Sequence, residues 1–254
     1  MMDTAMDPYG FARPGERLDD LQRGGLRILQ KSRGFRFGTD AVLLADFAAP
    51  RPGDRVVDLG TGTAVLPLLM SARSPSATFT AIELQPEMAG MAARSVALNR
   101  LEARIAVREA DLRDAASLLG CGCADLVVCN PPYSRRGAAL LNRDSTRALA
   151  RHEVSCTLAD VAESAAKLLR NGGRLAMVFP TPRLLELLDA QRAVRVEPKR
   201  VRLIHQRVQD PPKLALLEGV KLARPALHWL PPLILRDEHG AYTAEARRIY
   251  GQSS

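Results

Sequence analysis

Four consecutive residues, Asn130-Pro131-Pro132-Tyr133, form the segment of this chain best suited to chemistry. They follow Asp125–Cys129, a short apolar run typical of a strand inside a parallel sheet. The Asn130 side-chain oxygen and the Pro131 carbonyl can accept both hydrogens of an amino group whose lone pair is delocalised into a ring. Holding both hydrogens favours the pyramidal nitrogen that attacks a sulfonium methyl group in line. The prolines stiffen the turn and the Tyr133 ring can stack on a flipped base, so all four residues are predicted to be catalytic.

Taken alone, the sequence Asn-Pro-Pro-Tyr is also typical of a proline-rich turn that only ends a strand. Their position in the chain argues against that interpretation. They come after the fourth expected core strand, with a glycine turn after the first strand and an acid at the end of the second. Open α/β sheets bind ligands at the carboxyl ends of their strands. The arrangement therefore favours the catalytic interpretation.

The glycine turn is Gly60-Thr61-Gly62, which follows a hydrophobic strand and opens a helix. Glycines there let the backbone approach a ligand with no Cβ in the way. The third glycine of a dinucleotide-binding turn would fall at Val65, and no Gly-Lys-Ser/Thr of a phosphate-binding loop follows. Asp58 stands two residues before the first glycine, as in turns that bind a methionine-derived cofactor, where an acid can work near the amino-acid end.

Two further acids end core strands. Glu83 closes the expected strand Thr78–Glu83, where a carboxylate can accept both ribose hydroxyls of a nucleoside. Asp111 follows the third strand and can accept a hydrogen bond from an adenine amino group. The neighbouring Leu84 and Leu112 are predicted to line the same site. Each acid could instead be an ordinary exposed strand-end residue, and the order of the motifs favours binding.

The expected elements alternate between strand and helix from residue 55 onward, which predicts an α/β fold with a doubly wound, mostly parallel sheet. Before them, residues 26–37 suit a hairpin or short strand pair, and a helix begins at Thr39. Residues 1–25 are expected to be a flexible N-terminal extension, and 26–254 a single domain. The expected core strands are 55–59, 78–83, 104–108, 125–129 and 174–179. The expected helices are 64–72, 86–99, 157–169 and 182–191, and Asn171-Gly172-Gly173 is expected to stop the third of them. The last expected strands are 199–205, 213–220 and 233–235.

Composition narrows the class of protein. The net charge of +8 and pI near 9.8 favour a polyanionic partner such as RNA. Only five of the 36 basic residues are Lys, so a general preference for Arg in the proteome is an alternative explanation of this charge. The four Cys have no zinc spacing, and no metal site is expected. The acidic, Pro- and Gly-broken N-terminus is unlike a signal peptide, and the longest uncharged run, 59–72, is too short to span a bilayer. A cytoplasmic protein without membrane contact is expected.

Together these residues resemble the class I S-adenosylmethionine-dependent methyltransferases, in which Asn-Pro-Pro-Tyr is the signature of amino methylation. The resemblance implies a Rossmann-like fold with a seven-stranded, mostly parallel sheet, an antiparallel C-terminal hairpin, and S-adenosyl-L-methionine as cofactor. The cofactor-binding residues that follow from the motifs and the resemblance are Thr39, Asp40, Asp58, Gly60, Thr61, Gly62, Glu83, Leu84, Asp111, Leu112 and Asn130.

The resemblance narrows to one family. Residues 37–44, Phe-Gly-Thr-Asp-Ala-Val-Leu-Leu, are similar to the segment before the glycine turn in the bacterial tRNA1(Val) adenine-37 N6-methyltransferases. Arg151-His152-Glu153, Gly172-Gly173-Arg174 and the C-terminal strand pair extend the likeness over roughly residues 26–245. It implies that Thr39 and Asp40 lie against the cofactor and that the substrate is the N6 amine of an adenine in RNA, and among RNAs in tRNA. Contact of the Arg-rich stretch 134–154 with RNA stays open.

Two alternatives remain. Protein glutamine-N5 methyltransferases of release-factor type use the same turn, because an amide nitrogen poses the same chemical problem. They usually carry a sizeable N-terminal helical domain, whereas about 50 residues precede the first core strand here. The other alternative is a non-catalytic RNA-binding module on the same fold, against which the intact motifs argue. The sequence does not indicate the oligomeric state.

Overall fold

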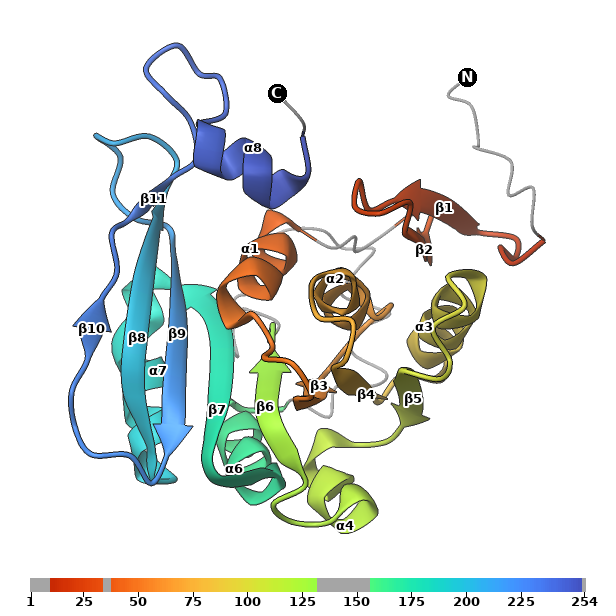
Figure 1. Cartoon of the computed structure of the whole chain (residues 1–254), viewed down its shortest axis with the longest axis horizontal. Helices are drawn as coiled ribbons and strands as arrows, with labels where there is room; N and C mark the ends of the chain where they lie inside the picture. The colour runs from red at the N-terminus through yellow and green to blue at the C-terminus, as the bar shows by residue number, and fades with distance from the viewer. Residues whose placement is uncertain (1–9, 34–37, 132–155, 253–254) are drawn as a thin grey trace, which may run out of the picture.

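The computed structural model describes residues 10–33, 38–131 and 156–252. Within them, nine strands form a mixed sheet in the order β10-β8-β9-β7-β6-β3-β4-β5, with β11 beside β8 (Figure 1). The order reverses direction between β3 and β6, which pair directly, so their carboxyl ends lie next to each other. The central parallel strands are β3 (Arg55–Leu59), β4 (Thr78–Glu83), β5 (Ile105–Glu109), β6 (Ala124–Cys129) and β7 (Leu169–Pro180).

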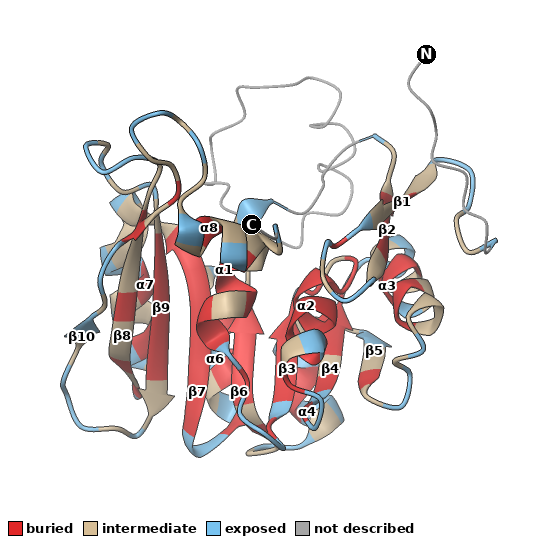
Figure 2. Ribbon diagram, turned by 45° about the horizontal axis from the view of Figure 1, so that its top comes forward, coloured by how far each residue is buried: buried red, intermediate tan, exposed pale blue. Residues whose placement is uncertain are grey.

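Helices cover both faces of this sheet, because its central strands are apolar on both sides. In β3, Val56 packs into the cluster on one face and Val57 into the cluster on the other. Figure 2 shows buried residues along β3, β6 and β7. One face carries α1 (Thr39–Ala48), α2 (Val65–Arg73), α3 (Pro86–Leu98) and α8 (Ala244–Tyr250); the other carries α4 (Ala115–Leu119), α6 (Leu158–Leu168) and α7 (Leu184–Ala193). Short 3-10 helices, η1 (Leu112–Asp114) and η2 (Thr181–Arg183), precede α4 and α7.

The C-terminal part of the sheet is antiparallel, as predicted. β9 (Leu214–Lys221) lies between β7 and β8 (Val196–His205) and runs antiparallel to both. Two two-residue strands, β10 (His228–Trp229) and β11 (Leu233–Ile234), pair with β8. The predicted seven-stranded sheet is therefore confirmed, and these two short strands extend it at the β8 edge.

An antiparallel hairpin precedes the core. Its strands are β1 (Glu16–Asp20) and β2 (Arg27–Lys31). The prediction that residues 1–25 form a flexible extension is wrong for β1, and the expected boundary at residue 25 falls inside the hairpin. The Pro and Gly residues that suggested disorder bracket β1 instead of interrupting it. Arg94 of α3 binds Glu16 through both guanidinium amino groups at 2.6 Å, which fixes the start of β1.

The glycine pair after α6 does not end that helix. Thr157 and Asp160 form the predicted capping box at its start. The helix ends at Leu168, however, and Asn171-Gly172-Gly173 lie within β7. A Cβ on Gly173 would stand 2.9 Å from the Arg170 carbonyl oxygen, so close backbone packing explains this glycine.

A buried charge network joins β7, β8 and β9 to the start of β3 at the amino edge of the sheet. The Arg174 guanidinium of β7 donates to Asp54, just before β3, at 2.8 Å and to Glu218 of β9 at 3.1 Å. Arg200 of β8 also donates to Glu218, at 2.8 and 3.0 Å. A further Arg174 bond reaches the Ala48 carbonyl at the end of α1. Each carboxylate in the network therefore has a cationic donor.

Candidate active site

The glycine turn connects β3 to α2 in a conformation that requires glycine. Gly60 has φ of 73° and Gly62 of 61°, both in the left-handed region. The Gly60 and Thr61 N–H groups donate to the Ile82 carbonyl of β4 at 3.0 and 2.9 Å, which anchors the turn to the neighbouring strand. A Cβ on Gly60 would meet nothing within 4 Å, so the turn is open on that side. The backbone is accessible to a ligand, as the sequence predicted.

Glu83, at the carboxyl end of β4, holds the turn from the side. One carboxylate oxygen accepts the Gly62 N–H at 2.8 Å and the other accepts the Gln85 N–H at 2.9 Å. Burial raises the pKa of Glu83, and these backbone donors oppose the shift. An ionised carboxylate offers about four acceptor sites, so both oxygens retain capacity for a ligand hydroxyl.

Asp58 lies beneath the same turn and is almost fully buried. Its Oδ2 accepts a hydrogen bond from the Thr61 hydroxyl at 2.6 Å, whereas its Oδ1 has no hydrogen-bond partner among the described residues. Burial raises the pKa of the Asp58 carboxyl to about 7; the Thr61 hydroxyl opposes this shift and the charge of Glu83 adds to it. A buried acceptor without a donor is costly, so the environment of Asp58 disfavours its ionised form.

This raised pKa gives a pH-dependent stability. Between about pH 4 and about pH 7 the folded protein keeps Asp58 protonated while the unfolded chain does not. The stability that Asp58 contributes through this linkage is therefore present at low pH and lost as pH rises through that window. We expect the free energy of unfolding of wild type to fall relative to Asp58→Asn over this range, measured by urea titration at several pH values. Parallel pH profiles for the two proteins would contradict the assignment.

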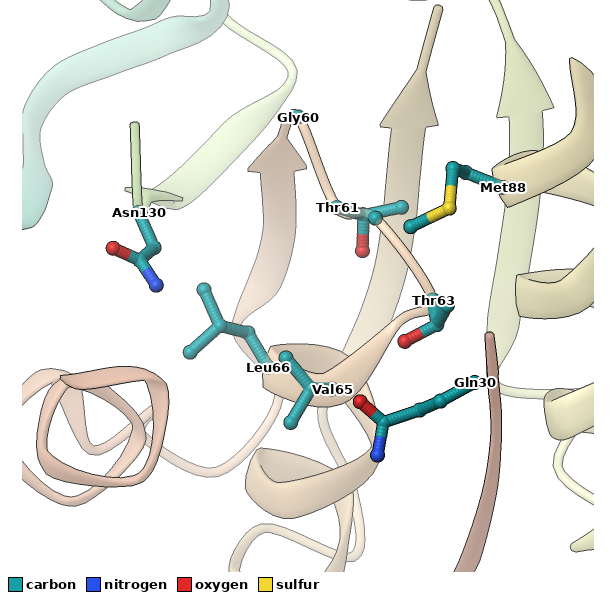
Figure 3. A pocket seen from close by; sticks show the side chains of 9 residues that line it. Gln30, Gly60, Thr61, Thr63, Val65, Leu66, Met88 and Asn130 are labelled. Atoms are coloured by element: carbon teal, nitrogen blue, oxygen red, sulfur yellow. The ribbon is translucent and has the colours of Figure 1, made fainter. Parts of the chain in front are cut away.

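A pocket opens between the glycine turn, the end of β6 and the β1–β2 hairpin (Figure 3). Of the predicted site residues, Gly60, Thr61, Gly62 and Asn130 line it. Asn130 reaches the pocket because β6 pairs with β3, which places the ends of the two strands side by side. The sequence analysis missed five other lining residues: Gln30, Thr63, Val65, Leu66 and Met88. Val65 and Leu66 begin the helix after the turn, a position from which their role was inferable.

The other predicted cofactor residues do not line this pocket. Thr39 and Asp40 begin α1, and Leu84 is exposed after β4. Asp111 follows β5 and accepts hydrogen bonds from the Arg113 backbone and guanidinium; the guanidinium bonds lower the pKa of its carboxyl. Leu112 begins η1 beside it. β5 ends next to β4, where the Ala110 N–H donates to the Glu83 carbonyl at 3.0 Å, so Asp111 continues the line of acids from Glu83.

Two predicted catalytic residues, Pro132 and Tyr133, lie outside the described residues, as do His152 and the Arg-rich stretch 134–154. Pro131 is described and partly buried directly after Asn130. Among residues 10–33, 38–131 and 156–252, no group of three or more His, Cys, Asp or Glu side chains could hold a metal ion. None of the helices in the same ranges is long and apolar enough to cross a membrane.

The site fits S-adenosylmethionine on three observations. The open turn at Gly60 admits a ligand against the backbone. Beside it, Glu83 keeps acceptor capacity for a ligand hydroxyl. Asn130 stands at the adjacent strand end, where a substrate amine can approach. This doubly wound sheet, with its pocket at the point where the strand order reverses, belongs to the class of S-adenosylmethionine-dependent methyltransferases.

Comparison with known proteins gives the family. Residues 34–187 match the model of the methyltransferase small domain. A tRNA1(Val) (adenine(37)-N6)-methyltransferase from Porphyromonas gingivalis is 32% identical, over 87% of this chain and 89% of its own. One of the same name from Aeromonas salmonicida is 36% identical over 60% of this chain and 63% of its own. The chain belongs to the methyltransferase small domain family, within the group that these relatives form.

Solved structures agree with the fold. The crystal structure of a predicted O-methyltransferase, Atu636 from Agrobacterium tumefaciens, is 26% identical and superimposes with a TM-score of 0.70, covering 85% of this chain and 97% of that one. Pyrococcus horikoshii TYW2 in complex with MeSAdo is 16% identical and has a TM-score of 0.57, covering 84% and 74%. The second likeness concerns the fold alone.

Proposed function

We propose that this protein transfers the methyl group of S-adenosylmethionine to the exocyclic N6 amine of an adenine in tRNA, and specifically to adenine 37 of tRNA1(Val). The observation that carries the proposal is the position of Asn130, which lines the same pocket as the glycine turn and is followed by Pro131. The shared name of the relatives from Porphyromonas gingivalis and Aeromonas salmonicida supports this choice of substrate.

The residues act by positioning. The Asn130 side-chain oxygen and the Pro131 carbonyl accept the two hydrogens of the adenine amine, which directs the nitrogen lone pair at the pocket. Bound S-adenosylmethionine supplies an electrophilic methyl group on sulfur. The fixed dipoles of the two acceptors stabilise the positive charge that develops on nitrogen. The methylated nitrogen is acidic, so no strong base is required. In the proposal Pro132 stiffens this turn and Tyr133 stacks on the base.

The pair of acceptors favours an amine over a hydroxyl as the methyl acceptor. An alcohol has a single hydrogen to hold and usually needs a base to remove it. Two adjacent acceptors match an amino group, which has two hydrogens. The name of the Agrobacterium structure, an O-methyltransferase, is therefore not carried over to this protein. A glutamine side-chain amide also has two hydrogens, so release-factor methylation is the alternative that the experiment must exclude.

The remaining parts of the proposal concern partners and location. The net charge of +8 supports an RNA partner, because phosphate neutralisation releases counterions. We expect the activity in the cytoplasm, where tRNA is matured. In this proposal the β1–β2 hairpin and the core that follows it act as a single methyltransferase domain.

The test is transfer of labelled methyl from S-adenosylmethionine to tRNA from cells that lack the modification, followed by nucleoside analysis. We expect label in N6-methyladenosine, and loss of label when adenine 37 of a tRNA1(Val) transcript is replaced by guanine. Ribosomal RNA and release factors are offered in parallel. Unlabelled tRNA with a protein that still binds S-adenosylhomocysteine would refute the tRNA assignment. Label in a release factor would select the glutamine alternative.

A further inference from the structure

The wall of the pocket opposite Asn130 comes from the β1–β2 hairpin. Gln30 of β2 is 3% exposed and lines the pocket together with the glycine turn. Side chains of α3 and of the residue that follows it hold this strand in place. The Leu29 N–H donates to the Ser95 hydroxyl at 3.0 Å, and the Arg27 N–H donates to the Asn99 side-chain oxygen at 2.9 Å. Through these bonds, backbone N–H groups of β2 are anchored to side chains outside the hairpin, which fixes the position of the strand that contains Gln30.

The two faces of the hairpin differ in character. Leu18 and Leu29 are paired across the strands and pack in one cluster with a methionine of α3. Arg17 and Gln30 are the next pair, so their side chains point to the opposite face. Asp19 shares that face with Arg17, two residues along β1. The hairpin therefore packs one apolar pair against α3. Its other face carries the three polar residues together with the buried Ile28, and of these Gln30 lines the pocket.

Asp19 fixes the orientation of the Gln30 amide. The Gln30 Nε2 donates to Asp19 Oδ2 at 2.5 Å, and Arg17 Nε donates to the same oxygen at 3.0 Å. A carboxylate paired with arginine only accepts hydrogen bonds, so the amide must present its NH₂ group to Asp19. Its Oε1 then faces the other way. Figure 3 shows this oxygen on the side of Thr63, with the nitrogen turned away.

The position of the pocket indicates which end of the cofactor Gln30 meets. The reactive methyl group must stand near Asn130. From the sulfur the molecule has two other branches, the ribose with its adenine and the amino acid. The side of the turn that holds Glu83, and beyond it Asp111, is suited to the ribose and adenine, and neither acid lines this pocket. The wall formed by Gln30 and Thr63 is thus left for the amino-acid branch.

We propose that Gln30 binds the amino-acid end of S-adenosylmethionine, with its Oε1 accepting a hydrogen bond from the α-ammonium group. Asp19 is a positioning residue that acts through the Gln30 amide. Recognition of the cofactor by this methyltransferase thereby depends on the N-terminal hairpin as well as on the Rossmann-like core. The contact concerns the cofactor alone and does not depend on which nucleic acid or protein is methylated.

The test compares two ligands by isothermal titration calorimetry. S-adenosylhomocysteine carries the amino acid, whereas 5′-methylthioadenosine shares the adenosine and sulfur but lacks it. Gln30→Met keeps the length of the side chain and removes its acceptor. Because hydrogen bonds to charged groups are strong, we expect this variant to bind S-adenosylhomocysteine roughly 10- to 100-fold more weakly than wild type. Its affinity for 5′-methylthioadenosine should stay within about twofold.

Two further variants keep the result interpretable. Gln252→Met, at an exposed position after α8, makes the same substitution at a residue that does not line the pocket and should leave both affinities unchanged. Asp19→Asn frees the amide to rotate and should weaken S-adenosylhomocysteine selectively, by a smaller factor. Equal losses for both ligands with Gln30→Met would mean a collapsed pocket and would overturn the proposal, as would unchanged affinity for S-adenosylhomocysteine. No RNA enters the measurement, so its failure is separable from that of the proposed tRNA activity.

Discussion

Replacement of Asn130 by alanine should lower kcat for methyl transfer to tRNA about 10²- to 10³-fold, the loss typical of removing one preorganised polar group that stabilises a transition state. The Asn130 side chain is partly buried at the end of β6, beside the glycine turn. Its truncation leaves the Pro131 carbonyl as the lone acceptor of the pair, so the adenine amine keeps its planar, unreactive geometry. Single-turnover kinetics with labelled S-adenosylmethionine and unmodified tRNA measure the effect on the chemical step.

Binding measurements separate this catalytic loss from a loss of cofactor. Asn130 was also predicted to touch the cofactor, and we expect the dissociation constant of S-adenosylhomocysteine to rise by less than about tenfold, as for one ordinary hydrogen bond. Asn171→Ala, at an exposed position in β7, is the matched control and should behave like wild type. If Asn130→Ala kept kcat within threefold of wild type, the two-acceptor mechanism would be wrong.

The core of the fold was predictable because its strands are buried on both faces. Arg55–Leu59 and Thr78–Glu83 were predicted with the bounds that the structure gives to β3 and β4. Continuous apolar runs bounded by glycine, proline or acidic residues carry this signal locally. The glycine turn and Asn130 were predictable for the same reason, since both stand directly after such strands and β3 and β6 pair. The glycine turn and Asn130, which are distant in sequence, are therefore neighbours at one edge of the sheet.

The parts that escaped prediction depend on contacts distant in sequence. β1, Glu-Arg-Leu-Asp-Asp, contains one apolar residue and is held by Arg94 of α3, 78 positions from Glu16. β10 has two residues, too few for a periodic pattern, whereas β11 falls within the predicted strand 233–235. Gln30 is one of three polar residues in a five-residue strand, and its place in the pocket follows from the docking of the hairpin on α3. The amino-acid composition of a short strand does not indicate which distant residues it contacts in the folded protein.

Replacement of Arg174 by methionine should lower the free energy of unfolding by about 3–5 kcal/mol, the cost of leaving buried carboxylates without their cation. The Arg174 side chain is 8% exposed and bonds both Asp54 and Glu218. Arg200 continues to pair with Glu218, but Asp54 loses its only ion-pair partner among the described residues. These residues join β3, β7 and β9, so the loss acts on the whole sheet. Urea unfolding followed by circular dichroism measures the change.

Two comparisons decide whether burial is the cause. Arg55→Met removes an arginine from a carboxylate at the same edge of the sheet, but the Arg55 side chain is 53% exposed and its partner Asp125 also binds Arg170. We expect a loss of at most about 1 kcal/mol there, since solvent screens the pair. Arg174→Lys keeps the charge but cannot donate to both carboxylates in the same geometry, so its stability should lie between wild type and Arg174→Met. Equal losses for Arg174→Met and Arg55→Met would show that the buried network adds nothing beyond a surface ion pair, and that hydrophobic packing alone determines how strongly β7 is held between β6 and β9.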